Sequence, residues 1–316
     1  MTANAASGKP DIAVVICTYK RPQSLARALA SLAAAVPPAR AAWRVVVVDN
    51  ADCPQTRAVT AEFRARLPLD ILVEPQAGLS RARNAAVQAV DAAYILWTDD
   101  DVTVDAGWLR AYEAAFAAFP DAAYFGGPVE LRFEGDPPGW LPDALPFIAT
   151  AYAQRSATPG LGPVGDDPGR IPFGANMAIR GAEQRAHRYD VRRGRQPGSR
   201  LLSGEESEVL AKIQAAGGIG IWVPEARVEH WISPDRQSIA YLRRYFEGRA
   251  FARAQAMPAD QLPTASSLWP DLLRSELSYL QGRLVRQPEI WVTALKKASR
   301  LRGILAARRE TSPRGG

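Results

Sequence analysis

Three consecutive aspartates, Asp99, Asp100 and Asp101, follow an apolar run in the stretch YILWTDDDVT at residues 94–103. Adjacent carboxylates repel one another and resist removal from water, so they need either solvent or a positive partner. Mg²⁺ and Mn²⁺ are hard cations that favour carboxylate oxygen and commonly take only one or two carboxylates from a protein. An acidic triplet by itself is more often a solvated loop, but its position at the end of a buried strand favours a cation site.

A basic segment, GLSRARN at residues 78–84, comes directly before a stretch of helical composition. Ser80 is a candidate N-cap of that helix, and Arg81 and Arg83 add positive charge to a helix N-terminus that already favours anions. The segment therefore predicts either an anion-binding helix start or simply a basic, capped helix.

A second acidic cluster occurs in SGEESEVLAKI at residues 203–213. Ser203 and Glu206 have the S-x-x-E spacing of a capping box, which explains one glutamate by structure alone. At about 100° per residue, Glu206 projects into the sector of the apolar residues of this helix, whereas Glu205 lies nearly a quarter-turn away. A carboxylate turned inward at a helix start is either a cap or a partly desolvated base with a raised pKa.

His230, in RVEHWI, is one of only two histidines in the chain. A histidine among aromatic residues is more often a packing residue than a ligand. Imidazole is nevertheless a suitable extra ligand for Mn²⁺ or a donor to a diphosphate oxygen. The other histidine, His187, lies in an Arg-rich stretch and is expected to be solvated.

Short apolar runs alternate with segments of helical length in the first half of the chain. The runs predict parallel strands buried on both faces, at residues 11–17, 43–49, 69–74 and 92–98. The segments between them predict helices at residues 23–35, 55–67 and 80–90. This alternation indicates an α/β protein with a doubly wound, mostly parallel sheet flanked by helices.

Sheets of this kind place their ligand sites beyond the carboxyl ends of the strands. Thr18 and Tyr19 follow the first run, Asp49 ends the second, and the aspartate triplet follows the fourth. The topology therefore predicts that these side chains gather at one edge of the sheet.

The middle of the chain is less regular. A helix at residues 106–119 and a strand at 122–127 are expected, followed by a loop-rich segment at 126–172. Because a compact domain rarely holds so long a stretch without structure, this segment reads as a functional or mobile loop.

The last part of the chain predicts three helices rich in Arg, Leu and Trp, at residues 238–257, 266–284 and 288–309. The apolar residues of the third helix share one stripe, made of Ile290, Ala294, Ala298, Leu301 and Leu305. A basic amphipathic helix of this kind either lies on an anionic membrane or packs on its own domain with a solvated cationic face.

Composition narrows the class of protein. The 316 residues carry a net charge of +6, with a pI of about 9.5, but most of the excess falls after Ala240, so the whole protein is not expected to bind nucleic acid. Cys17 and Cys53 are expected to be reduced thiols. Residues 1–10 lack the features of a secretory signal, and no apolar run reaches about 20 residues, so we expect a cytoplasmic protein, free or at the inner face of the cell membrane.

In their order and spacing, VVICTYKRP, VVVVDN, GLSRARN, WTDDDV, FGANMAIR, GEESE and VEHWISPDR resemble the motifs of the family 2 glycosyltransferases, which have the GT-A fold. The resemblance spans roughly residues 11–249. It implies an inverting, hexosyltransferase-type enzyme that moves a sugar from a nucleotide-diphosphate sugar, by default a UDP-sugar, to an acceptor hydroxyl in glycan or polysaccharide biosynthesis. The alternatives are a nucleotidyltransferase, whose usual glycine-rich loop is missing from TYKRP, and a non-catalytic module that binds nucleotide sugars or glycans.

The resemblance also implies binding roles for particular residues. Mn²⁺ or Mg²⁺ would be held by Asp101 and His230, with Asp99 as a further ligand or nearer to ribose or sugar, and Asp100 would be the least committed of the three aspartates. The nucleotide sugar would contact Thr18, Tyr19, Arg21, Asp49, Arg83, Asp99 and Asp100.

On the other side of the transferred sugar, Glu205 and Glu206 occupy the acidic pair of the family, whose second member is commonly the catalytic base. Aspartate is usual at the second place, so Glu206 is a departure from the pattern. Asn176 and Trp140 would lie on the side of the acceptor, which is expected to be a glycan or a lipid-linked molecule.

The resemblance predicts that the chain is divided into two parts. Residues 1–234 would form the GT-A catalytic domain, with a nucleotide-sugar half at about 11–127 and an acceptor half at about 128–234. Residues 235–316 would form a basic, helical C-terminal extension, which is the candidate for a peripheral membrane contact.

Overall fold

The computed structural model describes residues 11–156, 160–165, 167–196 and 204–311. The chain divides into two compact units. The first, called the sheet unit below, is made of Met1–Leu131, Arg155–Val191 and Glu205–Trp231. The second, called the helical unit, is made of Arg132–Gln154, Arg192–Gly204 and Ile232–Gly316.

An eight-stranded sheet organises the sheet unit. Its strands lie in the order β3 (Leu69–Val73), β2 (Trp43–Asp49), β1 (Ile12–Thr18), β4 (Tyr94–Asp99), β9 (Met177–Arg180), β6 (Tyr124–Gly126), β10 (Gly220–Trp222) and β8 (Gly162–Pro163). Strands β3, β2, β1 and β4 run parallel, and so do β6 and β10. Strand β9 is antiparallel to both of its neighbours, and β8 is antiparallel to β10. The expected mostly parallel sheet is therefore confirmed.

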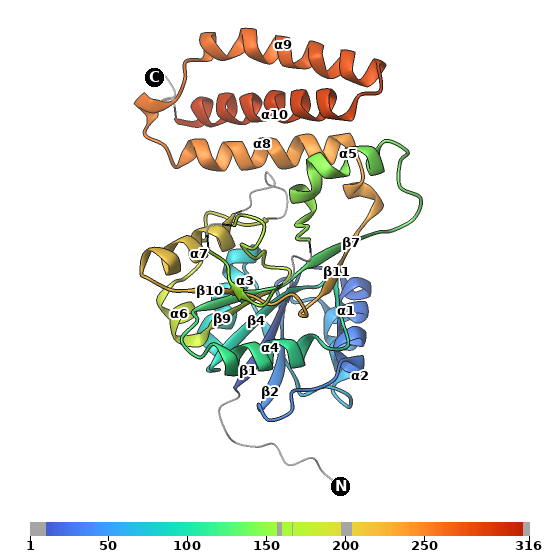
Figure 1. Ribbon diagram of the computed structural model, residues 1–316, viewed down its shortest axis with the longest axis vertical. Helices are drawn as coiled ribbons and strands as arrows, with labels where there is room; N and C mark the ends of the chain where they lie inside the picture. Colours follow the sequence, from blue (N-terminus) through green and yellow to red (C-terminus); the bar gives the residue numbers. More distant parts are fainter. Residues whose placement is uncertain (1–10, 157–159, 166, 197–203, 312–316) are drawn as a thin grey trace. The chain divides into compact units, whose positions relative to one another are not determined.

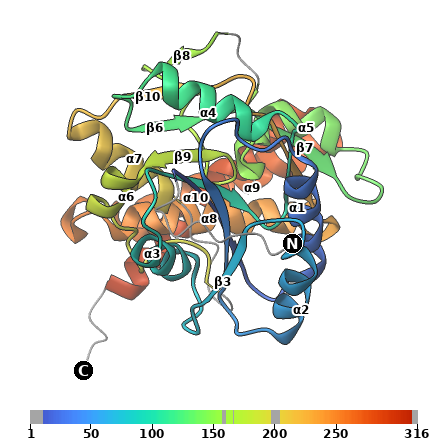
Figure 2. The ribbon, with the colours of Figure 1, turned by 90° about the horizontal axis from the view of Figure 1, so that it is seen from below.

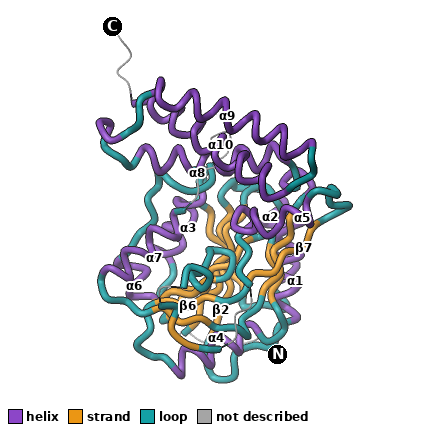
Figure 3. The backbone as a smooth tube through the Cα atoms, turned by 45° about the horizontal axis from the view of Figure 1, so that its top comes forward, coloured by secondary structure: helices purple, strands orange, loops and turns teal. Residues whose placement is uncertain are grey.

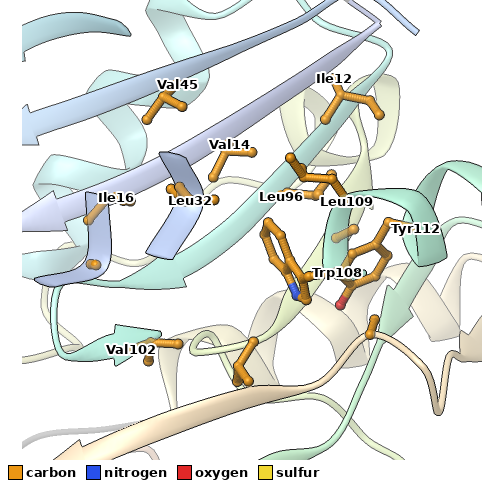
Figure 4. Close-up of a cluster of buried hydrophobic side chains, with 14 of the residues drawn as sticks. Ile12, Val14, Ile16, Leu32, Val45, Leu96, Val102, Trp108, Leu109 and Tyr112 are labelled. Carbon is orange, nitrogen blue, oxygen red and sulfur yellow. The ribbon is translucent and has the colours of Figure 1, made fainter. Parts of the chain in front are cut away.

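The central strands are apolar on both faces because helices cover each side of the sheet. Alternate residues of β1, such as Val14 and Val15, enter different buried clusters. The Val14 cluster includes residues of α1 (Pro22–Ala34), α2 (Pro54–Phe63) and α4 (Trp108–Ala118), and Figure 4 shows Val14 near Leu96 and Trp108. The Val15 cluster includes residues of α3 (Leu79–Ala89) and α7 (Glu205–Ala215). Figure 2 shows α1 and α2 on one side of the strands and α3 on the other.

The start of α3 differs from the sequence-based expectation. Gly78, not Ser80, is the N-cap, and its φ of 140° lets the chain turn into the helix. Ser80 lies inside the first turn and is buried. The helix itself lies within one residue of the predicted range, because its apolar periodicity is strong.

A three-stranded sheet brings distant parts of the sheet unit together. Its order is β5 (Val102–Val104), β11 (Val228–Ile232) and β7 (Val129–Phe133). Strands β11 and β5 are antiparallel, and His230 is paired with Val102. The segment 126–172, expected to be mainly loop, therefore contains a strand of this sheet, and it also contains α5 (Leu141–Ile148).

The helical unit contains α8 (Ile239–Gln255), α9 (Ala265–Leu284) and α10 (Pro288–Thr311), as the sequence predicts. Figures 1 and 3 show them side by side, with α10 between the other two. The Glu276 carboxylate of α9 accepts from Arg243 of α8 at 2.8 and 2.9 Å, and it lies 2.9 Å from Arg302 of α10. One acidic side chain thus links all three helices.

The apolar stripe predicted for the last helix is largely covered within this layer. Ala298, Leu301 and Leu305 pack against Leu268 and Leu272 of α9. Of the two alternatives for α10, packing on its own domain is therefore favoured, because α9 covers most of the stripe, and Ile290 at its start stays 45% exposed. Within the described ranges, no helix combines the length and the hydropathy needed to cross a bilayer.

Candidate active site

The carboxyl ends of β1, β2 and β4 are level with one another. Thr18 is paired with Asp49, and Cys17 is paired with Asp99. Side chains that follow these strands therefore meet at one edge of the sheet, as parallel pairing predicts.

Arg21, in the turn after β1, supplies the positive charge that the aspartate triplet needs. Its Nη1 donates to Asp100 Oδ1 at 2.6 Å, and its Nη2 donates to Asp101 Oδ2 at 2.9 Å. Thr18 Oγ1 donates to the other oxygen of Asp100 at 2.7 Å. The side chain of Asp99 points more to solvent and is 34% exposed.

Asp100 is thus not the least committed of the three aspartates, as the sequence reading had it. It is buried and has two side-chain partners. Burial raises the pKa of Asp100 to about 7, although the charge of Arg21 acts in the opposite direction, and Asp101 beside it raises the pKa further.

Asp101 and His230 lie together because β11 pairs with β5. His230 Nε2 is 3.4 Å from Asp101 Oδ1, and both side chains are almost fully buried. The Trp231 backbone N–H donates to the Asp101 carbonyl at 2.8 Å, which fixes the two segments.

Asp101 and His230 are the donors available to the metal that the family pattern implies. Within the described ranges, no three His, Cys, Asp or Glu side chains gather as a complete metal centre. Asp101 and His230 nevertheless offer one carboxylate oxygen and one imidazole nitrogen side by side. Those two donors fit Mn²⁺ or Mg²⁺, which usually keep positions for substrate phosphate and water.

The side chains of Asp49 and Asn50 stabilise the loop that follows β2. The Asp49 carboxylate is buried and accepts from the backbone N–H groups of Ala51 at 3.1 Å and Cys53 at 2.7 Å. Asn50 Oδ1 accepts from the Gly78 N–H at 2.7 Å and so ties this loop to the start of α3. Asp49 therefore shapes the loop in this structure rather than presenting a free carboxylate.

A pocket opens between the loops that follow β1 and β2. Tyr19 is partly exposed near it, and the neighbouring Lys20 ammonium lies 5.5 Å from the Tyr19 ring centroid. The pocket is lined by Lys20, Pro22, Gln23, Ala51, Asp52, Cys53, Pro54 and Gln55.

Arg83, from α3, lies at the centre of a second charged cluster. Its Nη1 donates to Glu205 Oε1 at 2.9 Å, and the same nitrogen is 3.8 Å from Glu206 Oε2. Its Nη2 is 3.8 Å from Asp99 Oδ1, so one guanidinium lies between the two acidic clusters. The side chain is only 3% exposed, and it faces carboxylates rather than open solvent.

The surroundings of Arg83 include residues that the sequence reading did not single out. The guanidinium carbon lies 5.8 Å from the Trp97 ring centroid and 5.3 Å from that of Tyr189. A Cβ added at Gly174 would overlap Arg83 Nη2, so only glycine leaves room there. Gly174 stands in the quoted motif FGANMAIR, but no local pattern indicates which side chain approaches it.

The structure reverses the expected orientation of the two glutamates. Glu205 is buried and belongs to the same face of α7 as the apolar residues, whereas the Glu206 side chain is 15% exposed. The helix projection failed because Arg83 provides a buried counter-charge for Glu205. Ser203 lies outside the described residues, so the capping box stays a prediction.

The two carboxylates differ in their surroundings. Burial raises the pKa of Glu205 to about 8, the charge of Glu206 adds to this, and Arg83 opposes it. Among the described residues, neither Glu205 Oε2 nor Glu206 Oε2 has a hydrogen-bond partner, and Arg83 Nη1 lies 3.8 Å from Glu206 Oε2. The Glu206 side chain is the more exposed of the two, by 15% against 4%.

Asn176 is a core residue. It is completely buried, and its Oδ1 accepts from Trp108 Nε1 at 2.9 Å and Tyr112 Oη at 2.8 Å. Its Nδ2 donates to the carbonyls of Pro128 at 2.9 Å and Ala226 at 2.6 Å. The expectation that Asn176 contacts an acceptor is therefore wrong for this structure, because its amide is fully used in packing.

Trp140 belongs to the helical unit, not to the sheet unit that carries the other candidate residues. Its ring packs edge-on against Trp291, with 5.5 Å between the centroids. This contact supports a packing role.

Comparison with known proteins agrees with the geometry. The glycosyl transferase family 2 model matches residues 13–165. A curated relative, the succinoglycan biosynthesis protein ExoM of Rhizobium meliloti strain 1021, is 31% identical over 266 residues, which cover 80% of this chain and 78% of ExoM.

Two solved structures are similar in fold. The mannosyltransferase PcManGT from Pyrobaculum calidifontis, in complex with GDP-Man and Mn²⁺, has a TM-score of 0.53 and 18% identity, covering 98% of this chain and 77% of PcManGT. S. aureus TarS 1–349 also has a TM-score of 0.53, with 13% identity, covering 96% of this chain and 93% of TarS. These likenesses show the GT-A fold, and the similarity to ExoM, together with the family model, shows that the chain belongs to glycosyl transferase family 2 and is a glycosyltransferase.

Proposed function

We propose that this glycosyltransferase uses a nucleotide-diphosphate sugar as donor and transfers its sugar, with inversion, to an acceptor hydroxyl in polysaccharide biosynthesis. The relative ExoM is a succinoglycan biosynthesis protein, and the fold neighbours include complexes with GDP-Man and with UDP. The observation that carries the proposal is the pair of acidic clusters at one sheet edge, each with its own arginine.

The donor would bind at the ends of β1, β2 and β4, with its nucleotide near Tyr19 and the pocket beside Lys20. Asp101 and His230 would hold Mn²⁺ or Mg²⁺, and the bound ion would neutralise charge on the departing nucleoside diphosphate. Asp99, as the most exposed of the three aspartates, is the one suited to reach ribose or sugar hydroxyls.

Arg21 is suited to a related task. Its side chain is 36% exposed although it bridges two carboxylates. A guanidinium that solvent reaches can turn toward a diphosphate, which it matches in geometry and charge.

Glu206 is proposed as the catalytic base. Its side chain is more exposed than that of Glu205, and its Oε2 would take the proton of the acceptor hydroxyl while the hydroxyl oxygen attacks the anomeric carbon. The bond from the anomeric carbon to the diphosphate oxygen breaks as the new bond forms, and one displacement inverts the anomeric centre. Arg83 and Glu205 would position this carboxylate, because their 2.9 Å ion pair fixes the start of α7.

Donor hydrolysis and thermal stabilisation test the proposal together. The full chain is incubated with a panel of UDP-, GDP- and dTDP-sugars, with and without Mn²⁺, and both nucleoside diphosphate release and the Tm are measured. One sugar nucleotide is expected to raise the Tm in a Mn²⁺-dependent manner, because a ligand that binds the native state stabilises it. Asp101→Asn is the control and should lose this dependence. The proposal fails if no sugar nucleotide stabilises the protein or releases its diphosphate.

A further inference from the structure

Helix α9 has two apolar faces, and only one of them is covered. Leu268 and Leu272 pack against α10 in the core of the helical unit. α9 contacts α10, and Figure 1 shows it as one of the two edge helices of this layer. On its other face, large apolar side chains are exposed: Trp269 by 45%, Leu273 by 61%, Leu277 by 67%, Leu280 by 62% and Leu284 by 84%.

These five residues, called the α9 stripe below, form one continuous surface. Their spacing of three or four residues places them within an arc of about 80° on a helix of 3.6 residues per turn. From Trp269 to Leu284 the stripe extends for about 22 Å at 1.5 Å per residue. Val285 and Ile290, which follow the end of α9 in the chain, are also exposed, by 51% and 45%. A contiguous apolar surface of this length marks an interaction site rather than scattered surface residues.

Positive charge borders the stripe. Arg274, whose side chain is 74% exposed and pairs with Asp271 at 2.9 Å, lies at one edge, and Arg283 lies at the other. The acidic residue nearest to that second edge, Glu276, is already neutralised by Arg243 and Arg302. Residues 232–316 contain fifteen Lys and Arg residues but only seven Asp and Glu residues.

We propose that the α9 stripe docks onto an anionic membrane surface, with the leucines in the acyl boundary and the bordering arginines at the lipid headgroups. An amphipathic helix binds such a surface through buried apolar area together with attraction to anionic lipid. The alternative occupant, a second copy of this chain, would bring two strongly cationic helical units together, which like-charge repulsion opposes. The charge around the stripe therefore selects lipid as the partner. The stripe belongs to the helical unit, and the proposed donor site belongs to the sheet unit.

The first experiment measures vesicle binding of the full chain by flotation. Vesicles of phosphatidylcholine alone are compared with vesicles that contain one-third phosphatidylglycerol, at low salt and at 0.5 M NaCl. The chain is expected to float with the anionic vesicles, at least tenfold more than with neutral ones, and to dissociate partly at high salt. No flotation at low salt overturns the proposal.

A triple variant, Leu273→Gln/Leu277→Gln/Leu280→Gln, tests the stripe itself. Glutamine keeps high helix propensity, and the three side chains lie outside the packed core, so the Tm should hold. Flotation should fall at least tenfold. The matched control, Val36→Gln/Leu161→Gln/Ile219→Gln, changes three exposed apolar residues of the sheet unit and should float like the unaltered chain.

Size-exclusion chromatography with light scattering separates lipid from self-association. A dimer that dissociates in the triple variant, combined with unchanged flotation, would overturn the proposal in favour of a second copy. Nucleoside diphosphate release in solution should be the same in both triple variants. If the chain floats with anionic vesicles but hydrolyses no donor, the proposed function is refuted and the membrane proposal stands.

Discussion

Two arginine–carboxylate clusters stand at the edge of the sheet, and they differ in their access to solvent. Arg21 bridges Asp100 and Asp101 with a side chain that is 36% exposed, whereas Arg83 pairs with Glu205 and is 3% exposed. A guanidinium that water reaches can turn toward another partner and stay solvated, although the buried carboxylates of Asp100 and Asp101 then need another positive charge. One that is enclosed by protein cannot turn away, because its own charge would lose compensation as well.

The comparison separates two tasks. Under the proposed function, a metal ion would take the place of Arg21 beside Asp101 while the guanidinium turns toward the diphosphate, so this cluster would bind and release ligands. The Arg83 cluster is fixed, with aromatic rings and Gly174 around it, so it is suited to hold a base in one position.

The largest expected effect is on turnover, from Glu206→Gln. The amide keeps the shape of the side chain but cannot take a proton, so kcat should fall by about 10²–10⁴-fold. The Tm should change little because the side chain is partly exposed. Turnover is measured as nucleoside diphosphate release with the donor found in the panel. Near-normal turnover together with a lowered Tm would show instead that Glu206 is a structural cap.

Arg83→Met should cause the largest loss of stability. Removal of one partner from a buried, hydrogen-bonded ion pair costs about 3–5 kcal/mol, and Arg83 also faces Asp99 and Glu206 at 3.8 Å. The free energy of unfolding is measured by urea titration. Arg21→Met is the matched comparison and should lose less, because the Arg21 guanidinium is 36% exposed and Asp100 keeps its hydrogen bond from Thr18. Equal losses in the two variants would contradict the comparison.

Gly174→Ala tests how tightly Arg83 is enclosed. The added methyl group would meet the guanidinium, so we expect a loss of about 1–3 kcal/mol, the usual range for overpacking. The same substitution at Gly139, where a Cβ would meet nothing within 4 Å, is the control. If both variants unfold at the same urea concentration, Arg83 can move aside.

Glu205→Gln addresses the pH dependence of stability. Because burial raises the pKa of Glu205 in the folded state to about 8, the folded protein holds this proton more tightly than the unfolded chain does. The stabilisation is therefore complete below the unfolded pKa of about 4.5 and is lost as pH rises toward 8. The free energy of unfolding of the variant should decrease less between pH 5 and pH 8 than that of the unaltered chain. Urea titration at each pH measures this decrease. If the free energy of unfolding of the variant falls with pH as steeply as that of the unaltered chain, other groups cause the decrease.

The smallest effect is expected on the Tm of Arg21→Met when Mn²⁺ is added. Without the guanidinium, Asp101 loses one of its positive partners, so Mn²⁺ should raise the Tm of this variant by more than that of the unaltered chain. Thermal shift at a series of Mn²⁺ concentrations measures the difference. A smaller shift in the variant would mean that Arg21 helps to bind the ion rather than standing in for its charge.

Much of the sheet unit was predictable because its signals are local. Continuous apolar runs and the residues between them defined β1 to β4 and α1 to α3 to within a few residues. The position of Asp99 to Asp101 after a buried strand followed from the same pattern, since parallel strands bring their carboxyl ends together.

The orientation of single side chains was less predictable. A helix projection turned Glu206 inward, but Glu205 is buried because Arg83 lies opposite it, 122 residues away along the chain. Asn176 stood in a recognisable motif, yet its partners come from four other segments. These choices depend on partners that periodicity does not reveal.

The sequence alone determined the family, the order of the elements and the chemical types at the sheet edge, because apolar periodicity and motif spacing are properties of neighbouring residues. Only the tertiary structure decided which arginine pairs with which carboxylates and which apolar stripe stays exposed. The stripe on α10 is covered by α9, whereas that on α9 is left open. Both helices have apolar stripes in the sequence, and burial depends on what packs against a stripe, which is a property of the whole fold.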